Sequence, residues 1–512
     1  MPDHNRLQIE PLPNFRPAPP KASAMIEALR GLGYSPATAL ADIIDNSITA
    51  RATRVYLDFQ WCGSDSRIVI LDDGHGMDDG ELDSAMRLGE RSPLEERDSH
   101  DLGRFGLGLK TASFSQCRSL TVSSRKKGGT MSCLRWDLDV LVNSRDDGWH
   151  LLEGSAPGSR NYLEPLVEKE SGTLVLWERL DRIVTAGFGE QDFLDLIDVV
   201  ERHLAMVFHR YLDSPRLNLR IFINNRQIKP WDPFLLNHSA TWSSPVEHLG
   251  VLPKMVEVQC HVLPHKDFLD ANTVESAGGP DGWTAQQGFY VYRNLRLLVA
   301  GSWLGLGQGR SWTKEEAYRL ARIRLDLPNT LDDEWKIDIR KSSARPPAAL
   351  RGRLTRLAED TRRRAREIFA HRGKVTRSPT ETGTISQAWR PERFRGGMRY
   401  RIDESHPVVK LVLDEAGGLV PQIKAMLRVL EETVPVQRIW LDTSESHETP
   451  RVNFAEQPPD EVLSILKVMY RSFVNRKGMS PSLAREQLLR TEPFNLYPDL
   501  VSQLSDSPDS EE

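Results

Sequence analysis

The sequence is poor in the features that mark secreted, disulfide-linked and membrane proteins. Its 512 residues include only four cysteines, with no CxxC spacing, which argues against a zinc site or a disulfide framework and predicts buried, inert thiols. No apolar run approaches the roughly 20 residues that cross a bilayer. The first segment, MPDHNRLQIEPLPNFRPAPP, lacks the basic start and apolar core of a secretory signal, so we expect a cytoplasmic protein without a membrane partner.

A strong excess of either charge is also missing. The formal net charge is -5, which argues against a globally basic nucleic-acid coat but leaves room for a local basic patch. With 39% apolar and 27% charged residues, the composition is that of an ordinary globular protein. A chain of 512 residues is too long for a single core, so we expect about two to four domains.

Helical and extended patterns alternate up to residue 190. Apolar spacing predicts helices at 21–33 and 36–50. Extended runs predict strands at 54–59, 67–73, 120–125, 130–138 and 172–180. Helices combined with an antiparallel or mixed sheet predict an α+β layer domain over residues 21–190, preceded by a disordered or strap-like segment, residues 1–20.

A second region, residues 191–374, begins with an amphipathic helix at 191–212. Strands are expected at 219–225, 288–301 and 321–328. A long helix should follow Pro346 and Pro347, because proline suits a first helical turn. The pattern predicts a second α/β domain, followed by a linker rich in Gly, Ser, Thr and Pro at 375–390.

The last region, residues 391–503, is smaller. Helices at 421–434 and 461–473 flank a predicted strand at 436–442. We therefore expect a small α/β domain, and the acidic tail 504–512 should be disordered.

One predicted helix, 36–50, separates its side chains into two faces. The apolar face carries Leu40, Ile43, Ile44 and Ile48. The other face carries the polar residues Asp42, Asp45, Asn46 and Thr49. This spacing puts an acid, Asp42, beside an amide, Asn46.

A first glycine-containing turn, DDGHGM, follows the strand at 67–73 directly. The carboxylate of Asp72 can accept a hydrogen bond from an exocyclic amine, while Gly74 and Gly76 let the backbone pass close to a flat base. A tight turn with a solvated acid is the alternative interpretation, and the motif alone does not decide between them.

A second such turn, GRFGLGLK over residues 103–110, precedes the helix-compatible sequence 111–117. Glycines at the mouth of a helix present backbone N–H groups and the positive end of the helix dipole, which suits phosphate oxygens. The turn lacks the βαβ context of a dinucleotide fingerprint and the GK[ST] ending of a P-loop. A tight packing turn is the alternative.

The order of these features is informative: an acid and an asparagine on a helix, then DxGxG after a strand, then GxxGxG before a helix, within about seventy residues. This order resembles the GHKL ATPase superfamily, which includes gyrase B, the ninety-kilodalton heat-shock chaperone, histidine kinases and MutL. The resemblance implies a Bergerat-type two-layer α/β sandwich that binds ATP and Mg²⁺, followed by a transducer-like α/β domain of the ribosomal-protein fold.

The resemblance also implies roles for the motif residues. Asn46 would ligate Mg²⁺ through its amide oxygen. Asp42 would be the general base, although the family usually has a glutamate there, one methylene longer, so hydrolysis is expected to be slow. The adenine pocket would contain Asp72, Gly74, Gly76, Met77 and Thr173. The phosphates would be wrapped by Gly103, Arg104, Phe105, Gly106, Leu107, Gly108 and Lys110, with residues 81–101 as the ATP lid.

A lysine of the second domain contacts the γ-phosphate in gyrase-like and MutL-like proteins. Lys341, in WKIDIRKSSARPP, falls at about the corresponding point and would be a second catalytic residue, as a point charge suited to a terminal phosphate. An ordinary surface lysine is the alternative.

Among GHKL proteins, the runs ALADIIDNSITA, LDDGHGM and GRFGLGLKTAS are most similar to MORC-type ATPases, and especially to prokaryotic relatives linked with restriction or anti-phage defence clusters. The resemblance covers about residues 20–375 and implies a Mg²⁺-dependent ATPase that acts on DNA as an ATP-gated homodimeric clamp or switch. A non-hydrolysing, ATP-gated scaffold that recruits partner effectors is the alternative. No DQHAxxE-like run appears in the C-terminal region, so nuclease or helicase activity is expected in separate partner proteins.

The long helix after Pro347 is the most basic segment of the chain. Its arginines are Arg351, Arg353, Arg356, Arg362, Arg363, Arg364, Arg366 and Arg372. Such a helix could follow a DNA phosphate backbone, since each phosphate contact releases counterions. A solvated helix whose arginines pair locally is the alternative.

Overall fold

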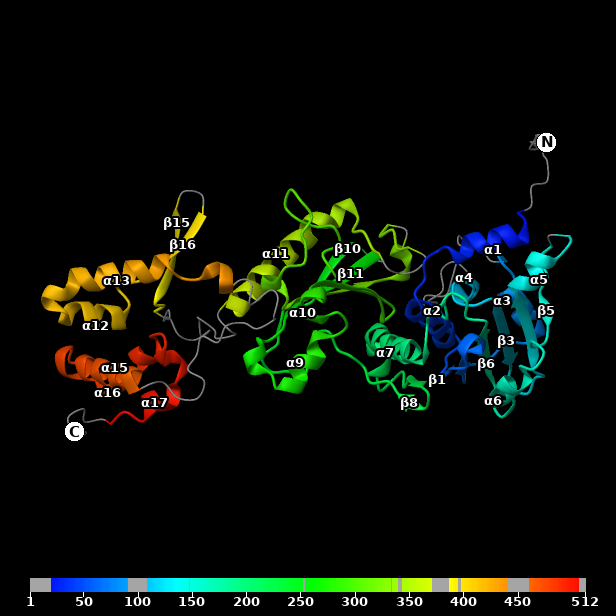
Figure 1. Ribbon diagram of the computed structural model, residues 1–512, viewed down its shortest axis with the longest axis horizontal. Helices are drawn as coiled ribbons and strands as arrows, with labels where there is room; N and C mark the ends of the chain where they lie inside the picture. Colours follow the sequence, from blue (N-terminus) through cyan, green and yellow to red (C-terminus); the bar gives the residue numbers. More distant parts are fainter. Residues whose placement is uncertain are drawn as a thin grey trace, which may run out of the picture. The chain divides into compact units, whose positions relative to one another are not determined.

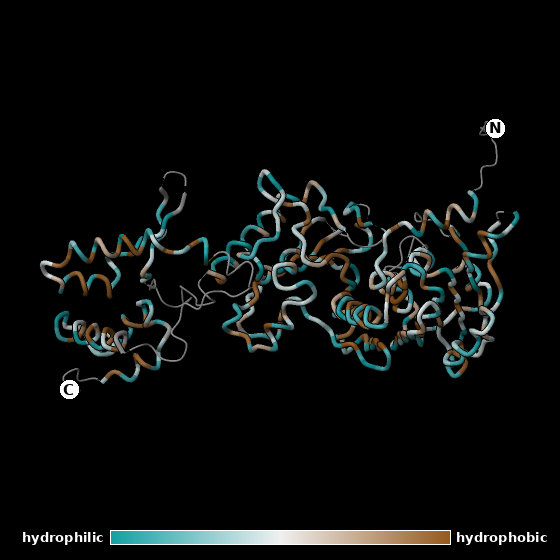
Figure 2. Tube along the Cα trace, in the orientation of Figure 1, coloured by the Kyte–Doolittle hydropathy of each residue, from teal (hydrophilic) through white to brown (hydrophobic). Residues whose placement is uncertain are grey.

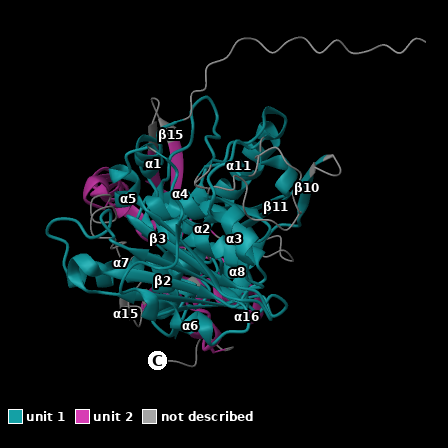
Figure 3. Cartoon of the chain, turned by 90° about the vertical axis from the view of Figure 1, so that its right-hand side faces the viewer, with its two compact units in different colours: residues 1–373 teal, residues 374–512 magenta. Residues whose placement is uncertain are grey.

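The chain forms two compact units, residues 1–373 and 374–512, which Figure 3 shows in separate colours. The computed structural model describes residues 20–90, 108–146, 148–251, 254–332, 334–338, 343–370, 386–394, 397–439 and 460–505. Most residues of the predicted N-terminal strap, linker and acidic tail lie outside these ranges. Each unit has its own hydrophobic core.

The first sheet runs in the order β5-β4-β3-β6-β2-β1-β7-β8. Figure 1 labels β1, β3, β5, β6 and β8 of this sheet. Its strands are β1 (Arg54–Gln60), β2 (Arg67–Asp72), β3 (Ser119–Arg125), β4 (Ser132–Asp137), β5 (Leu152–Glu153), β6 (Gly172–Glu178), β7 (Arg220–Ile223) and β8 (Arg226–Gln227). Every neighbouring pair is antiparallel except β1 and β7, which are parallel. The five strands predicted before residue 190 are confirmed as β1, β2, β3, β4 and β6.

Helices cover this sheet and complete a two-layer arrangement. They are α1 (Ala22–Arg30), α2 (Pro36–Thr49), α3 (Asp79–Met86), α4 (Gly108–Phe114), α5 (Leu138–Asn143), α6 (Glu164–Val167), α7 (Glu190–Val207) and α8 (His209–Leu212). The main core joins Ile43 and Ile44 of α2 to Leu204 of α7 and to strand residues such as Val55. A smaller apolar cluster, including Leu166 of α6, lies against Leu71 and Leu174. The fold is the mixed α+β sandwich expected for a Bergerat-type domain.

The strand expected at 219–225 belongs to the first sheet, which corrects its assignment to the second region. Helix α7 packs against α2 and brings the chain back to the edge of the sheet. There β7 pairs in parallel with β1, with Arg220 opposite Arg54. The first sheet therefore extends beyond residue 190, to Gln227.

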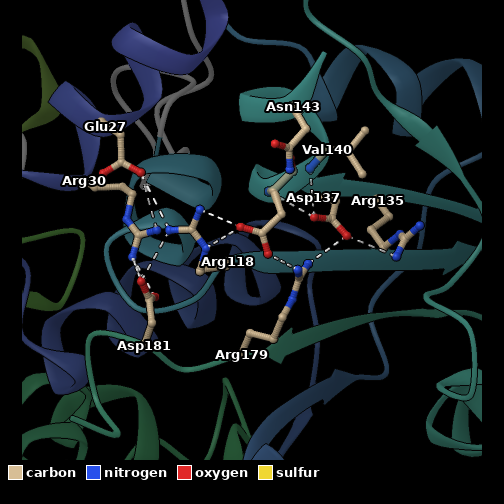
Figure 4. A network of polar contacts seen from close by, with 10 residues as sticks. Glu27, Arg30, Arg118, Arg135, Asp137, Val140, Asn143, Arg179 and Asp181 are labelled. Atoms are coloured by element: carbon tan, nitrogen blue, oxygen red, sulfur yellow. Dashed lines mark hydrogen bonds and ion pairs between the residues drawn. The ribbon is translucent and has the colours of Figure 1, made fainter. Parts of the chain in front are cut away.

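An ion-pair network holds α1 and α5 against the strand ends (Figure 4). The guanidinium of Arg30, fully buried on α1, donates to Asp181 just after β6 at 2.6 and 2.7 Å. Arg118, at the start of β3, pairs with Asp139 of α5 at 2.7 Å. Arg179 then joins Asp139 to Asp137, the N-cap of α5. The network fixes the end of the sheet that α1 covers.

The second sheet runs β10-β11-β14-β12-β13, with β9 (Trp242–Ser243) paired to β11. Its other strands are β10 (Glu247–Val251), β11 (Lys254–Val262), β12 (Gly288–Arg293), β13 (Arg296–Ser302) and β14 (Ala321–Leu327). The strands predicted at 288–301 and 321–328 are confirmed, the first as the β12–β13 hairpin. Helix α11 (Ala348–Ala370) packs on β11 and β14 through Leu354, Ala358 and Ala365. Short helices α9 (Ala271–Gly278) and α10 (Gly282–Ala285) precede β12.

The second unit contains a β-hairpin and helices. They are β15 (Trp389–Phe394), β16 (Gly397–Ile402), α12 (Pro407–Glu415), α13 (Val420–Glu432), α15 (Asp460–Arg471), α16 (Pro481–Leu489) and α17 (Pro498–Ser502). Its core gathers Leu466 and Tyr470 with Leu488 of α16. Figure 2 shows apolar and polar residues alternating along α12 and α13.

The strand predicted at 436–442 is wrong where the structure describes it. Residues 436–439 are helical, with the Ile439 N–H donating to the Pro435 carbonyl at 2.9 Å, because proline favours the first turn of a helix. The hairpin β15–β16 was not predicted, and its first strand begins within the predicted linker.

The four cysteines are not all buried, although the sequence predicts that they are. Cys117 and Cys260 are buried and Cys133 is partly buried, but Cys62 is exposed because it lies in the loop between β1 and β2. Within the described ranges, no helix is long and apolar enough to cross a bilayer.

Candidate functional site

Helix α2 has a capped start and carries the predicted polar side chains on one face. Its N-cap, Ser35, accepts a hydrogen bond from the Thr38 N–H at 3.2 Å, and Pro36 occupies the first turn. The apolar face predicted from the sequence packs into the core. On the other face Asp42 and Asp45 are buried, whereas Asn46 is exposed. The structure thus places the predicted acid in the interior and the predicted amide at the surface of the same helix.

The Asp42 carboxylate is engaged on both oxygens. Its Oδ2 accepts the Tyr34 hydroxyl at 3.0 Å, and its Oδ1 lies 3.5 Å from Nη2 of Arg296 on β13. Burial raises the pKa of Tyr34, and the neighbouring Asp42 charge adds to this effect, so Tyr34 remains a donor at neutral pH. Nε of Arg296 also lies 3.1 Å from each oxygen of Asp45. One arginine of the second sheet therefore faces two buried acids.

Asp72, at the end of β2, joins three segments of the chain. Its Oδ1 accepts the Gly74 N–H at 2.9 Å and the Thr173 N–H at 3.2 Å. Its Oδ2 accepts the Ser47 hydroxyl of α2 at 2.8 Å. Burial raises the pKa of Asp72, and these three hydrogen bonds oppose the rise. A carboxylate offers about four acceptor positions, so one position on Oδ2 remains for a further donor.

The turn after β2 leaves no room for side chains at its glycines. Gly76 has a φ of +67°, and a Cβ there would lie 1.9 Å from the Arg125 carbonyl oxygen. A Cβ on Gly74 would lie 2.8 Å from the Ala50 Cβ. These close backbone approaches are the geometry expected of the DxGxG turn.

Hydrogen bonds tie this turn to β3 and β6. The Met77 N–H donates to the Ser124 hydroxyl at 2.8 Å, and that hydroxyl also lies 2.8 Å from the hydroxyl of Thr173. The structure thus places the predicted residues Asp72, Met77 and Thr173 in one connected group.

Helix α4 is described from Gly108 onward, and this residue lies beside the predicted base. A Cβ on Gly108 would lie 3.9 Å from Oδ2 of Asp42. Lys110 is buried, and its Nζ donates to the Ala85 carbonyl at the end of α3 at 2.8 Å. Burial lowers the pKa of Lys110 to about 8. In this arrangement the ammonium caps α3, and its phosphate role stays a prediction.

Several predicted residues lie outside the described parts of the chain. They are Gly103, Arg104, Phe105, Gly106, Leu107 and Lys341. Two described residues flank Lys341: the Ser343 N–H donates to Asp338 at 2.8 Å, and the charge of Asp338 is a minor contributor, after burial, to the raised pKa of Tyr34.

The lid predicted at 81–101 begins too early. Residues 81–86 form part of α3, with Leu82 and Met86 buried, and this helix starts with a capping box between Asp78 and Glu81. Because these residues belong to the packed core, only the later part of the segment can act as a lid, and residues 91–101 lie outside the described ranges.

Sequence reasoning missed four residues of this site: Tyr34, Ser47, Ser124 and Arg296. Ser47 adjoins Asn46 and was within reach of the helical pattern. Arg296 carries no local signal, since it is separated from Asp45 by 251 positions.

Comparison with known proteins agrees with this geometry. Residues 34–173 match the family described as histidine kinase-, DNA gyrase B-, and HSP90-like ATPase, which defines this part of the chain as a GHKL-type ATPase domain. The ATPase morc-1 of Caenorhabditis elegans is 30% identical over 254 residues, which cover 41% of this chain and 29% of that protein. The DNA mismatch repair protein MutL of Rhodospirillum rubrum is 35% identical over 94 residues, covering 18% of this chain and 15% of that protein.

The MutL protein of Rickettsia canadensis gives a similar match, 30% identical over 94 residues. Residues 34–173 thus belong to the GHKL superfamily, and the chain is homologous to MORC and MutL ATPases over the matched segments. The matches span less than a third of the length of these relatives.

Proposed function

We propose that the first sheet and its helices bind ATP with Mg²⁺ and hydrolyse it slowly. The observation that carries this proposal is the Asp72 carboxylate, which links α2, the glycine turn and β6 and retains one acceptor position for an exocyclic amine. An adenine amine is a donor of this kind.

The described side chains fit the metal as well. Asn46 is an exposed amide on the same helix as the buried acids, and an amide oxygen is a hard ligand suited to Mg²⁺. Among the residues that the structure describes, no three His, Cys, Asp or Glu side chains cluster as a metal cage. This suits Mg²⁺ held by one side chain together with substrate phosphates. When bound, the ion neutralises charge on the phosphate oxygens.

The protein side of the reaction rests on Asp42. Its carboxylate would take a proton from the water that attacks the terminal phosphorus, while Tyr34 holds its second oxygen in place. Gly108 of α4 lies beside this carboxylate, which supports its assignment to the phosphate side of the site. Lys341 is proposed to reach the terminal phosphate from the second region.

Two variants test hydrolysis and metal binding separately. Asp42→Asn should lower steady-state phosphate release by about a hundredfold while ATP binding survives, because only the base is removed. Asn46→Ala should lose the Mg²⁺ dependence of ATP binding. Asp58→Asn, on the exposed face of β1, is the matched control and should leave both unchanged. Equal phosphate release by the wild type and Asp42→Asn would refute the role of Asp42.

We further propose that ATP drives two copies of the chain together as a clamp or switch on DNA, in a defence or DNA-transaction system with separate nuclease or helicase partners. Support comes from the relationship to MORC and MutL proteins. The MutL relative is named as a DNA mismatch repair protein. Dimer formation should depend on ATP and Mg²⁺, as measured by light scattering with a non-hydrolysable analogue. A monomer under all nucleotide conditions would contradict the clamp.

The arginines of α11 divide into buried and exposed groups. Arg362 is 7% exposed, and its guanidinium lies 3.7 Å from the ring centroid of Tyr318 and 4.7 Å from those of Trp303 and Trp312. It packs in the core and is unavailable to DNA. Arg353 and Arg363 are exposed but pair with Glu247 and Asp360, at 2.6 and 2.7 Å.

DNA binding by α11 is therefore best tested with Arg356 and Arg366, two other exposed arginines of this helix. Replacing both with Gln should reduce the salt dependence of DNA affinity, by about 0.9 in log–log slope for each phosphate that an arginine no longer neutralises. Arg353→Gln, whose side chain already pairs with Glu247, is the control. An unchanged slope in the double variant would remove α11 from the DNA interface.

A non-hydrolysing scaffold is the second candidate. It is favoured by the engagement of both Asp42 oxygens, with Tyr34 and with Arg296, and by the short aspartate side chain. Absence of turnover in the wild type, with and without DNA, together with intact ATP binding, would select it.

A further inference from the structure

The β12–β13 hairpin of the second sheet reaches the first sheet through its turn. The two turn residues, Asn294 and Leu295, have φ values of +47° and +67°, which suits a tight two-residue hairpin turn. A leucine is rarely found in this left-handed conformation, so the surroundings must hold it there. Leu295 packs against the core of the first sheet, and Tyr211 of α8 donates to the Asn294 carbonyl at 2.5 Å.

This turn separates two arginines that face each other in the hairpin register, Arg293 and Arg296. Arg293 is buried and pairs with Asp332, which belongs to the same region of the chain. Arg296 reaches Asp42 and Asp45 of α2. Within the hairpin, Arg293 thus pairs with an acid of its own region, whereas Arg296 contacts the acids of the candidate site.

Every nitrogen of the Arg296 guanidinium is used. Nε contacts both oxygens of Asp45 at 3.1 Å, Nη2 faces Asp42 at 3.5 Å, and Nη1 donates to the Leu297 carbonyl at 2.8 Å. Arg296, Asp42 and Asp45 are only 4%, 4% and 2% exposed. Two carboxylates one helical turn apart both face this buried cation, so removing it takes away a favourable charge interaction that the two acids share.

We propose that Arg296 is a positioning residue for the reaction: it fixes the Asp42 carboxylate and makes its placement depend on the hairpin of the second sheet. This inference rests on the proposed hydrolysis. Tyr34, beside α2, and Arg296, from β13, both contact Asp42 and come from different parts of the chain. A shift of the hairpin relative to α2 therefore moves a group that orients the base, while the hydrogen bonds to Asp72 come from Ser47, Gly74 and Thr173.

The geometry predicts a split between turnover and affinity. Arg296→Gln should lower kcat on the order of tenfold to a hundredfold, because a misplaced catalytic group loses rate steeply with distance. The affinity for ATP should stay within about twofold, since Arg296 does not touch the adenine side. Arg296→Lys should restore part of the rate, and Asp45→Asn, which removes the anchor of the arginine, should show the same split.

Arg210 provides a matched control. It also joins the first sheet's helices to the second sheet, through an ion pair with Asp326 and by packing 4.7 Å from the Tyr292 ring centroid, and these two contacts involve strands rather than α2. Arg210→Gln should leave kcat within about twofold if Arg296 acts through Asp42. An equal loss of rate in Arg210→Gln would mean that any loosening between the sheets slows turnover, and would overturn the proposal.

A second readout separates this proposal from the proposed hydrolysis. Hydrogen exchange of the hairpin, residues 288–302, should change when a non-hydrolysable ATP analogue and Mg²⁺ bind, and the change should vanish in Arg296→Gln. If the wild type shows no turnover but the hairpin responds in this Arg296-dependent way, hydrolysis fails and the link between the sheets stands. If the response survives in Arg296→Gln, or the wild-type hairpin does not respond, the proposal is wrong.

Discussion

The glycine turn after β2 gives the sharpest stability prediction. Replacing Gly76 with Ala places a Cβ 1.9 Å from the Arg125 carbonyl oxygen and 3.1 Å from that of Gly172, at a φ of +67°. The left-handed conformation alone costs about 1 kcal/mol. A contact of 1.9 Å cannot exist, so the turn or the end of β3 must move by more than 1 Å (roughly the shortfall from ordinary contact).

We expect Gly76→Ala to lower the free energy of unfolding by about 3–5 kcal/mol. The displaced turn should also break the bond from Met77 to Ser124 and weaken ATP binding. Gly128 is the control, because it has a similar φ of +75° in the nearby β3–β4 turn and nothing within 4 Å of a Cβ. Its replacement by Ala should cost only about 1 kcal/mol.

Urea unfolding followed by tryptophan fluorescence, with titration of a fluorescent ATP analogue, measures both effects. If Gly76→Ala proves as mild as Gly128→Ala and binds the analogue normally, the turn is not the close-packed element described above. A large drop in stability with unchanged nucleotide affinity would separate the turn from the nucleotide site.

Three other side chains give predictions from burial. Burial lowers the pKa of Lys110 to about 8, so its charged form opposes folding below pH 8. Urea unfolding should show the wild-type free energy of unfolding rising by roughly 3 kcal/mol between pH 8 and 10.5, relative to Lys110→Met. His209 contacts the Tyr292 hydroxyl at 2.8 Å, and burial lowers the pKa of His209 to about 3. The wild-type free energy of unfolding should therefore fall by about 2 kcal/mol from pH 6.5 to 5, and the fall should be smaller in His209→Gln. Arg362→Gln should destabilise the chain by about 2–4 kcal/mol and Arg363→Gln by under about 0.5 kcal/mol, and equal effects would disprove the aromatic packing of Arg362.

The sequence predicts well those elements whose signal is local. The two faces of α2 follow from helical spacing, and its start follows from Ser35 and Pro36, so both acids and Asn46 can be placed from the sequence alone. The DxGxG turn is equally local, because glycine at a positive φ is required at Gly76 whatever the distant surroundings.

Predictions from the sequence fail where contacts between distant parts of the chain determine the structure. The pattern at 219–225 predicts a strand but not its sheet, because its partner, β1, lies more than 150 positions earlier. In the sequence, Arg296 looks like any polar residue after a turn, because its contact with α2 exists only in the folded structure. Residues 436–439 show the reverse case: their β-branched composition predicts a strand, but the turn started by Pro435 is helical. The hairpin β15–β16 did carry a signal, the glycine pair at 396–397, but Pro391 and the many charges obscured it.

Equilibrium binding of ATP to the full chain in the presence of Mg²⁺ tests the central claim most directly. The wild type should bind, and Asp72→Asn should bind about tenfold to a hundredfold more weakly, because an amide in place of the carboxylate weakens the acceptor for the adenine amine. Asp73→Asn should bind normally, since the Asp73 carboxylate accepts its hydrogen bonds from Thr53 and Arg54. No binding by the wild type, or equal binding by the wild type and Asp72→Asn, would contradict the account.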